Sequence, residues 1–233
     1  MKTTAIVLAA GSGRRMGTKV RKQYLDLNGQ EMIRYSLQAF EDSNADDIIL
    51  VCGEEDIPRN RAYMTEFHKL TDVVAGGRER YHSVYEGLKA AGGCDLVLIH
   101  DGARPLIEVK IINECIDTLS VEEGCYVAVP SKDTVRITDP EGYTASTPDR
   151  DRVWIVQTPQ AFRYETVLKA YERLIREEES GSASGLHITD DVMVAEHFGG
   201  IRARCVMGAY DNIKITTPED MSFAEAVLRG HGK

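Results

Sequence analysis

Short apolar runs alternate along this chain with amphipathic segments. Four of the runs are nearly continuous in Ile, Val, Leu and Ala, which is typical of strands covered on both faces: Thr3–Ala9, Asp47–Cys52, Asp95–His100 and Cys125–Val129. Apolar residues at helical spacing follow three of these runs and recur later, in four sets: Ile33, Leu37 and Phe40; Val84, Leu88 and Ala91; Val109, Ile112, Ile116 and Leu119; and Val167, Leu168, Tyr171, Leu174 and Ile175. This alternation predicts an α/β fold with a mainly parallel sheet flanked by helices.

Near the carboxyl end, Pro218 is followed by two acidic residues and preceded by Thr217. A threonine can cap a helix, and acidic side chains stabilise its first turn, so we expect a last helix to begin at Pro218.

Two regions interrupt the alternation. Residues 133–157 contain no helical stripe; they have an alternating segment, a turn at Asp139–Gly142 and a β-rich segment at Val153–Val156. This pattern predicts a protruding β-hairpin arm, and because an isolated hairpin is marginally stable in water, the arm needs a packing partner. The second region, Glu177–Gly185, predicts a flexible solvated loop with no catalytic role.

Composition narrows the class of protein. The 233 residues predict one domain, residues 1–233, and 28 basic against 37 acidic residues give a net charge of −9, which argues against a nucleic-acid partner. The longest purely apolar run, Ala5–Ala10, is too short for a membrane span or a signal peptide. Five scattered cysteines without a CxxC pair favour reduced, mostly buried thiols, so we expect a cytoplasmic protein without a membrane partner.

The loop after the first apolar run has the composition of a phosphate-binding site. It contains three glycines, and five cations fall within nine residues: Arg14, Arg15, Lys19, Arg21 and Lys22. Glycines let backbone N–H groups approach a ligand, and crowded cations in an acidic protein favour a bound anion over a merely solvated loop.

Three kinds of phosphate loop compete for this segment. The P-loop is excluded because no Gly-Lys-Ser/Thr occurs. The glycines form GxGxxxG, a near miss of the dinucleotide motif, and Glu54 could contact a ribose; this leaves a nicotinamide-binding oxidoreductase as a remote alternative, although such loops do not normally hold five cations. Leu8–Met16 instead matches a nucleotidyltransferase loop, LAAGxGxRM, followed by Lys22.

Other segments extend that match along nearly the whole chain. They are Gly76–Val84 (GGxxRxxSV), His100–Pro105 (HDAARP), Asp133-Thr134 after Val129-Pro130, Asp149–Phe162 (DRxxLWxxQTPQxF), Thr189–Asp191 and Asp211–Lys214. With these motifs the chain resembles the 2-C-methyl-D-erythritol 4-phosphate cytidylyltransferases of the non-mevalonate isoprenoid pathway. It departs from the family pattern at Arg21, where proline is usual, and at Gly102, where alanine is usual.

The resemblance implies a Rossmann-like nucleotidyltransferase fold and a reaction. A cytidylyl group would pass from CTP to 2-C-methyl-D-erythritol 4-phosphate, giving 4-diphosphocytidyl-2-C-methyl-D-erythritol and pyrophosphate. An acceptor such as ribitol 5-phosphate remains the alternative, because a pentitol-phosphate cytidylyltransferase would share the fold and the CTP loop. The stretch from Asp149 to Gln160 favours the first acceptor.

The resemblance also assigns roles to residues. Arg15 and Lys22 would stabilise the transition state, and nucleotide contacts would come from Ala9, Ala10, Gly11, Ser12, Gly13, Gly76, Gly77, Ser83 and Asp101. The acceptor would be held by Arg104, Thr134, Arg150, Thr158 and Lys214.

Asp101 has a second predicted role, as a metal ligand. It ends a buried strand, so its carboxylate should emerge at the ligand edge and bind Mg²⁺ or another divalent cation; Asp211 is a weaker second candidate. Finally, the family's arm reaches across a two-fold axis, so the resemblance implies a homodimer with shared active sites.

Overall fold

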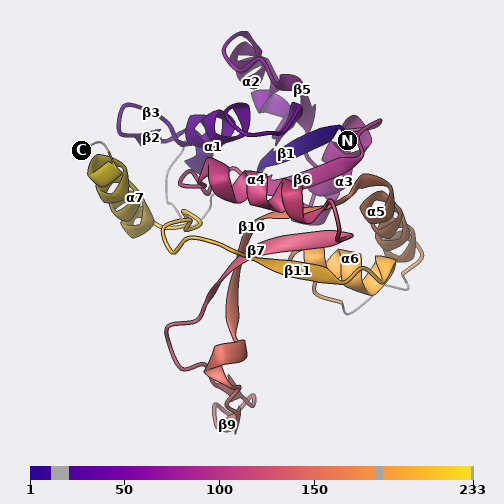
Figure 1. Cartoon of the computed structure of the whole chain (residues 1–233), viewed down its shortest axis with the longest axis vertical. Helices are drawn as coiled ribbons and strands as arrows, with labels where there is room; N and C mark the ends of the chain where they lie inside the picture. The colour runs from indigo at the N-terminus through magenta and orange to yellow at the C-terminus, as the bar shows by residue number, and fades with distance from the viewer. Residues whose placement is uncertain (12–20, 182–185, 232–233) are drawn as a thin grey trace.

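One sheet forms the centre of the molecule (Figure 1). Across residues 1–11, 21–181 and 186–231, which the computed structural model describes, seven strands pair in the order β11-β7-β10-β6-β1-β4-β5. The strands are β1 (Thr3–Ala9), β4 (Asp47–Cys52), β5 (Leu70–Ala75), β6 (Leu96–Asp101), β7 (Gly124–Pro130), β10 (Trp154–Arg163) and β11 (Ala203–Met207). Only β10 runs antiparallel to its neighbours among these described strands, so the predicted mainly parallel sheet is confirmed.

Helices cover both faces of the sheet, which explains why its central strands are continuously apolar. The helices α1 (Met32–Glu41) and α4 (Val109–Thr118) pack on one face, and α3 (Arg80–Ala90), α5 (Tyr164–Glu179) and α6 (Asp191–Gly199) pack on the other. The four predicted helical stripes fall on α1, α3, α4 and α5.

The last helix, α7 (Pro218–His231), begins where the sequence predicts. The Thr217 hydroxyl accepts a hydrogen bond from the Asp220 N–H at 3.4 Å, and the Asp220 carboxylate accepts one from the Thr217 N–H at 2.9 Å. This reciprocal cap satisfies N–H groups that a helix start leaves unpaired. The helix covers a small apolar cluster beside the strand pair β2 (Asp26–Leu27) and β3 (Gln30–Glu31).

Short helical segments complete the amino-terminal half. They are η2 (Lys22–Tyr24), η3 (Glu54–Asp56), α2 (Ile57–Arg61) and η4 (Ala62–Thr65).

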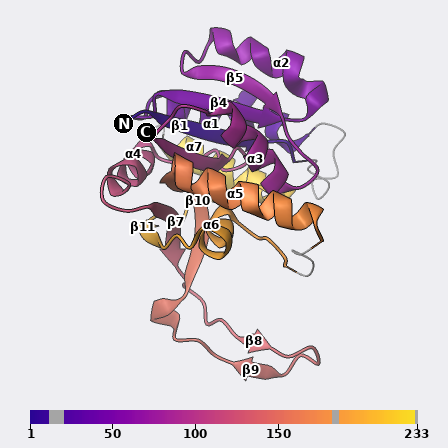
Figure 2. The ribbon, with the colours of Figure 1, turned by 90° about the vertical axis from the view of Figure 1, so that its right-hand side faces the viewer.

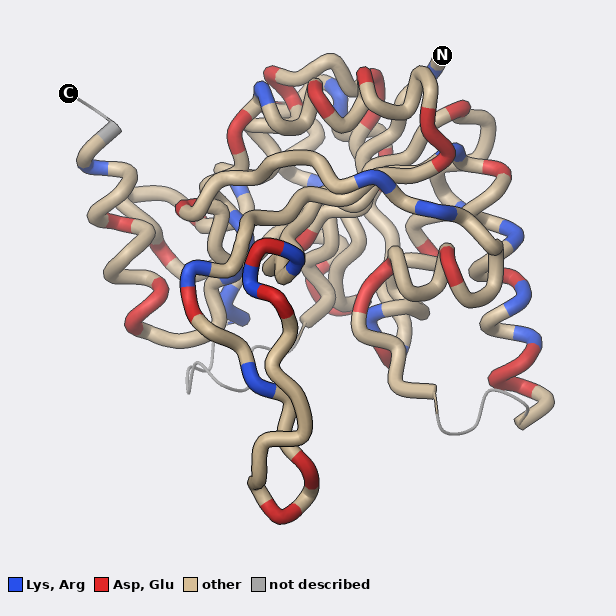
Figure 3. The backbone as a smooth tube through the Cα atoms, turned by 60° about the horizontal axis from the view of Figure 1, so that its bottom comes forward, with Lys and Arg blue, Asp and Glu red and all other residues tan. Residues whose placement is uncertain are grey.

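A β-hairpin arm projects from one end of the sheet (Figure 2). It leaves after β7 and returns into β10, with the short strands β8 (Ile137–Thr138) and β9 (Thr144–Ser146) paired antiparallel and the turn η5 (Arg150–Arg152) on its return leg. At the tip, the Asp139 carboxylate accepts a hydrogen bond from the Tyr143 N–H at 2.8 Å. Lys and Arg are interspersed with Asp and Glu along the described chain, the arm included (Figure 3).

Several elements differ from the sequence prediction. The strands β5 and β11 and the helix α6 were not predicted, and the β-rich segment at Val153–Val156 begins a long strand that enters the sheet between β6 and β7. The predicted loop at Glu177–Gly185 is wrong for its first three residues, because α5 continues to Glu179 and is held there by the Arg173–Glu177 and His82–Glu178 pairs. Residues 182–185 lie outside the described residues.

The five cysteines are free thiols, and four of them are buried, as predicted. Within the described ranges, none of the helices combines the length and the apolar character that crossing a membrane requires.

Candidate active site

A pocket of about 550 Å³ lies where the carboxyl ends of β1 and β6 meet. Parallel neighbours end at the same edge of a sheet, and α/β folds bind ligands there. Eight of the predicted site residues line it: Ala9, Ala10, Gly11, Lys22, Gly77, Ser83, Asp101 and Lys214. Ser12, Gly13 and Arg15 lie outside the described residues.

Asp101 is the last residue of β6 and forms the acidic centre of the pocket. One carboxylate oxygen lies 3.2 Å from Arg80 Nε, and the other lies 2.7 Å from Lys214 Nζ. Burial by itself disfavours the charged form, but Arg80 and Lys214 outweigh it and hold the pKa of the Asp101 carboxyl well below its usual range. Asp101 is therefore an anion at physiological pH.

Arg80 is a pocket residue to which the sequence analysis assigned no role. It opens α3, lines the pocket and forms a two-pronged ion pair with Asp191, with Nη1 and Nη2 at 2.7 and 2.8 Å from the two carboxylate oxygens. Arg80 is the arginine of the GGxxRxxSV motif at Gly76–Val84, so the sequence does mark the position. The motif does not reveal that Arg80 pairs with Asp191, which is 111 residues away in the sequence.

Lys22 and its neighbour Gln23 line the pocket and contact two other segments of the chain. The Lys22 ammonium donates a hydrogen bond to the Ile215 carbonyl at 2.7 Å, next to Lys214. Gln23 is buried and donates to the carbonyl of Ala9 at the end of β1. These contacts bring segments far apart in the sequence to the same wall of the pocket.

The segment before α3 approaches β1 very closely. A Cβ atom at Gly76 would lie 2.6 Å from the Ala10 Cβ and 2.7 Å from the Ser83 hydroxyl, so a larger residue at 76 would push these groups apart. The Ser83 hydroxyl accepts a hydrogen bond from the Gly77 N–H at 3.1 Å. Gly76 itself does not line the cavity, but its lack of a side chain allows Ala10 and Ser83 to do so.

Thr158 and Arg104 were predicted to bind the acceptor, but neither residue lines the pocket. The buried Thr158 hydroxyl accepts a hydrogen bond from the Asp101 N–H at 3.0 Å and lies 3.1 Å from His100 Nδ1. Arg104 donates to the Asn212 carbonyl at 2.7 Å, while its Nε has no hydrogen-bond partner and burial lowers its pKa. Thr158 thus orients the strand end that presents Asp101.

His100 precedes Asp101 in β6 and is fully buried. Burial lowers its pKa to about 4, so the imidazole is neutral at physiological pH. Its Nε2 lies 3.2 Å from the Arg104 carbonyl, which fits a neutral ring protonated at Nε2 and accepting from the Thr158 hydroxyl at Nδ1.

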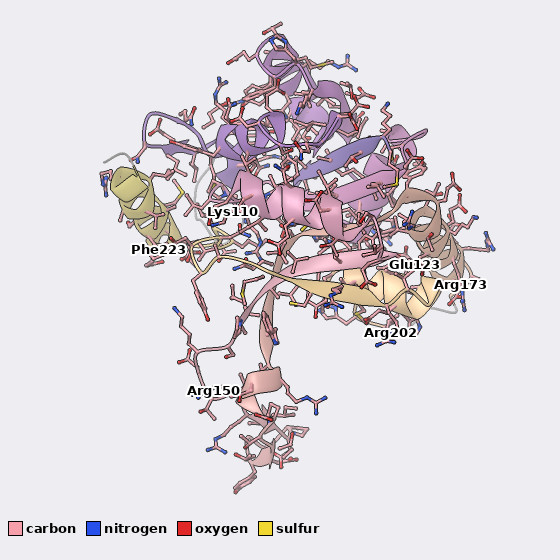
Figure 4. All side chains as sticks on the ribbon, in the orientation of Figure 1. Lys110, Glu123, Arg150, Arg173, Arg202 and Phe223 are labelled. Atoms are coloured by element: carbon pink, nitrogen blue, oxygen red, sulfur yellow. The ribbon has the colours of Figure 1, made fainter. Side chains whose placement is uncertain are left out.

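Thr134 and Arg150 are not brought to this pocket by their own chain. Both are exposed on the arm, and neither lines the cavity. Figure 4 shows Arg150 on the arm, beyond the end of the sheet. Asp211, the weaker metal candidate, does not line the cavity either.

The fold and the site define a nucleotidyltransferase: a glycine next to a strand end, converging cations and the ionised carboxylate of Asp101 meet at the carboxyl edge of a mainly parallel sheet. Comparison with known proteins specifies the family. Residues 3–230 match the family model of 2-C-methyl-D-erythritol 4-phosphate cytidylyltransferase (IspD), and the chain belongs to this family.

Relatives and solved structures agree with this family. The chain is 48% identical to the 2-C-methyl-D-erythritol 4-phosphate cytidylyltransferase of Lachnoclostridium phytofermentans, over 99% of this chain and 97% of the relative. It is 46% identical to that of Lachnospira eligens, over 97% and 99%. The crystal structure of 4-diphosphocytidyl-2C-methyl-D-erythritol synthase from Anaerococcus prevotii superposes with a TM-score of 0.86 at 34% identity, covering 98% of this chain and 96% of that one.

Family membership confirms the predicted fold class and the predicted activity. The chain is a cytidylyltransferase of isoprenoid precursor biosynthesis. The pentitol-phosphate and oxidoreductase alternatives are not favoured by these matches.

Proposed function

We propose that this chain transfers a cytidylyl group from CTP to 2-C-methyl-D-erythritol 4-phosphate in the pocket at the ends of β1 and β6. The observation that supports this site is the convergence of four separate motif segments on one cavity. The end of β1, the start of α3, Asp101 and Lys214 all line it. The volume of about 550 Å³ is in the range of a small-ligand site.

The reaction needs positioning and charge neutralisation more than proton transfer. An oxygen of the acceptor phosphate attacks the α-phosphorus of CTP, the bond from that phosphorus to the β-phosphate oxygen breaks, and pyrophosphate leaves. The nucleophile is already an anion, so no general base is required. Lys22 and Lys214 line the pocket and can bind the phosphates of the two substrates, which would otherwise repel each other.

The small side chains around Ser83 suit a pyrimidine. Gly76 and Gly77 allow the start of α3 to approach β1, which leaves backbone groups and one hydroxyl to meet the base. A purine is too large for such a pocket. Uracil differs from cytosine at position 4, where it has a hydrogen-bond acceptor in place of the donating amino group of cytosine. A polar pocket matched to cytosine would leave groups unpaired with uracil, which costs far more than a lost apolar contact.

A divalent cation, Mg²⁺ in our proposal, would be held by Asp101 and by the substrate phosphates. In the described part of the chain, no group of three or more metal-binding side chains is present. Mg²⁺ commonly takes only one or two carboxylates in addition to phosphates and water, so the ionised carboxylate of Asp101 fits that donor set. The ion would neutralise phosphate charge during the transfer.

We also propose a homodimer in which each arm completes the partner's site. The arm and the neighbouring strand ends expose large apolar side chains, which favour coverage by another surface: Ile137, Tyr143, Ile155, Val156, Met207 and Tyr210. Thr134 and Arg150 are exposed on that arm and contribute nothing to their own pocket.

The free thiols suit a reducing compartment, so we propose a cytoplasmic location.

The reaction is tested by measuring pyrophosphate release with CTP, Mg²⁺ and each acceptor in turn. We expect release with 2-C-methyl-D-erythritol 4-phosphate, little with ribitol 5-phosphate, and a strong loss when UTP or ATP replaces CTP. Equal rates with the two acceptors would contradict the acceptor assignment. Equal rates with CTP and UTP would contradict the base-reading role of residues 76–83.

A further inference from the structure

A buried network behind the pocket ends on Arg80. Asp191, at the first turn of α6, is fully buried and accepts from both Nη groups of Arg80. It also accepts from the Tyr171 hydroxyl of α5 at 2.5 Å. Tyr171 is fully buried as well, so water cannot replace this hydrogen bond.

The backbone of Asp191 is held in place as well. The side-chain oxygen of Gln160, in β10, accepts from the N–H groups of Asp191 and Val192, both at 2.8 Å. Three elements, α5, α6 and β10, therefore determine where the Asp191 carboxylate lies. Asp191 does not line the pocket, and its contact with Arg80 links it to a residue that does.

Arg80 transmits this constraint to the reacting centre. Its two Nη groups bind Asp191, and its Nε lies 3.2 Å from Asp101. A two-pronged arginine–carboxylate pair fixes the plane of the guanidinium group, and a single pair would not. The bidentate ion pair with Asp191 therefore sets the direction in which the Arg80 Nε–H points towards Asp101.

We propose that Asp191 and Tyr171 are positioning residues for nucleotidyl transfer, acting through Arg80 on Asp101. Asp191 also balances the charge of Arg80: Asp101, Asp191, Arg80 and Lys214 together carry no net charge. Loss of the Asp191 charge adds one positive charge next to the phosphates. Nucleotide binding should then be kept, while the alignment of Asp101 during transfer is lost.

Tyrosine-to-phenylalanine variants test this role without creating a cavity. Tyr171→Phe removes the hydroxyl that orients Asp191. Tyr164→Phe is the matched control, because Tyr164 lies in the same helix, is buried, and donates its hydroxyl to the Leu88 carbonyl at 3.0 Å, away from Arg80. We expect Tyr171→Phe to lower kcat by about 3–10-fold, as for one lost hydrogen bond, and Tyr164→Phe to change it by less than about two-fold.

The split between binding and turnover separates positioning from a general loss of structure. For Tyr171→Phe, the dissociation constant for CTP, titrated without acceptor, should stay within about two-fold of wild type. Asp191→Asn should show the same pattern with a larger fall in kcat, about 10–100-fold, because it removes the charged partner. Lysine cannot form the bidentate ion pair with Asp191. In an Arg80→Lys background, Tyr171→Phe should therefore cause no further fall in kcat.

Three results would overturn the inference: equal kcat for the two phenylalanine variants, a weakened CTP affinity with unchanged kcat, or an undiminished effect of Tyr171→Phe beside Arg80→Lys. The inference rests on the proposed function, so wild-type protein is assayed in parallel. Failure of the wild type to release pyrophosphate from CTP would overturn the proposed function and the inference together. An active wild type with indistinguishable variants would overturn the inference alone.

Discussion

The Lys214 ammonium lies 2.7 Å from a carboxylate oxygen of Asp101, at the end of the strand that forms the pocket's floor. Arg80 holds the other oxygen at 3.2 Å, so Asp101 lies between two cations. A divalent cation bound by Asp101, as we propose, would share this carboxylate with Lys214 and Arg80. We therefore expect the proposed metal–nucleotide complex to depend on the negative charge of Asp101.

Asp101→Asn should consequently abolish most of the activity. The amide keeps the shape but removes the charge that would bind Mg²⁺ in our proposal, and we expect kcat/KM to fall by about 10²–10³-fold, partly restored at raised Mg²⁺. Steady-state pyrophosphate assays over a Mg²⁺ series measure this. Asp95→Asn, an exposed aspartate just before the same strand, is the control and should behave like wild type. An Asp101→Asn enzyme with wild-type Mg²⁺ dependence would show that Asp101 is only a structural residue.

Asp101 also shows what the sequence could predict. It follows an uninterrupted apolar run, and the end of a buried strand is where α/β folds place ligand-binding groups. Arg80 and Asp191 could not be paired in the same way, because their contact spans 111 positions and depends on how α3 and α6 pack.

The inner part of β10, the strand β11 and the helix α6 lack a clear sequence pattern for physical reasons. β10 carries the buried polar residues Gln157, Thr158 and Gln160, whose hydrogen-bond partners come from Asn212, Asp101 and Asp190. Tertiary hydrogen bonds, invisible in a local window, compensate for burying them. β11 is an edge strand in which only Val206 is buried, and α6 is apolar on most sides.

Gly102 is a departure from the family pattern that the structure explains. A Cβ at this position would lie 2.4 Å from Ile33 Cδ1 and 3.0 Å from the Leu8 carbonyl oxygen. We expect Gly102→Ala to lower the free energy of unfolding by about 1–3 kcal/mol through overpacking, measured by urea denaturation. Gly92→Ala meets no atom closer than 3.6 Å and should leave stability nearly unchanged. Equal stability of the two variants would mean that α1 moves freely to accommodate the methyl group.

Stability should depend on pH through His100. Its pKa is about 4 in the folded protein against 6.5 for an unperturbed histidine, because burial disfavours the charged ring. Below about pH 6.5 the unfolded chain binds a proton that the folded protein does not, so stability falls as the pH drops from about 6.5 towards 4. From pH 7 to 4.5 this one group should remove about 2–3 kcal/mol.

The contribution of His100 can be isolated by urea titrations of wild type and His100→Gln across that range. Asp101, whose pKa in the folded protein lies well below the usual range, is present in both proteins, so its own contribution to the pH dependence cancels in the comparison. The glutamine variant should lose less stability on acidification than wild type. Parallel curves would indicate that water reaches His100 and lets it titrate normally.

The proposed dimer with shared sites makes the most specific prediction, because Lys22 lines its own chain's pocket and Arg150 does not. Lys22→Ala and Arg150→Ala should each be nearly inactive as homodimers. In a mixed dimer, one site receives both lesions and the other receives neither. With equal amounts and full subunit exchange, half of the dimers are mixed and each has one intact site of two, so activity should recover to roughly a quarter of wild type.

A second mixture provides the control for that experiment. Lys22 and Lys214 line the same pocket of one chain, so Lys22→Ala mixed with Lys214→Ala leaves one lesion in every site of a mixed dimer. Subunit exchange, followed with two different affinity tags, must be complete in both mixtures. Recovery in the first mixture and none in the second is expected if the arm acts across the dimer. If Arg150 acts within its own chain, the first mixture behaves like the second, and the model of shared sites fails even where a dimer forms.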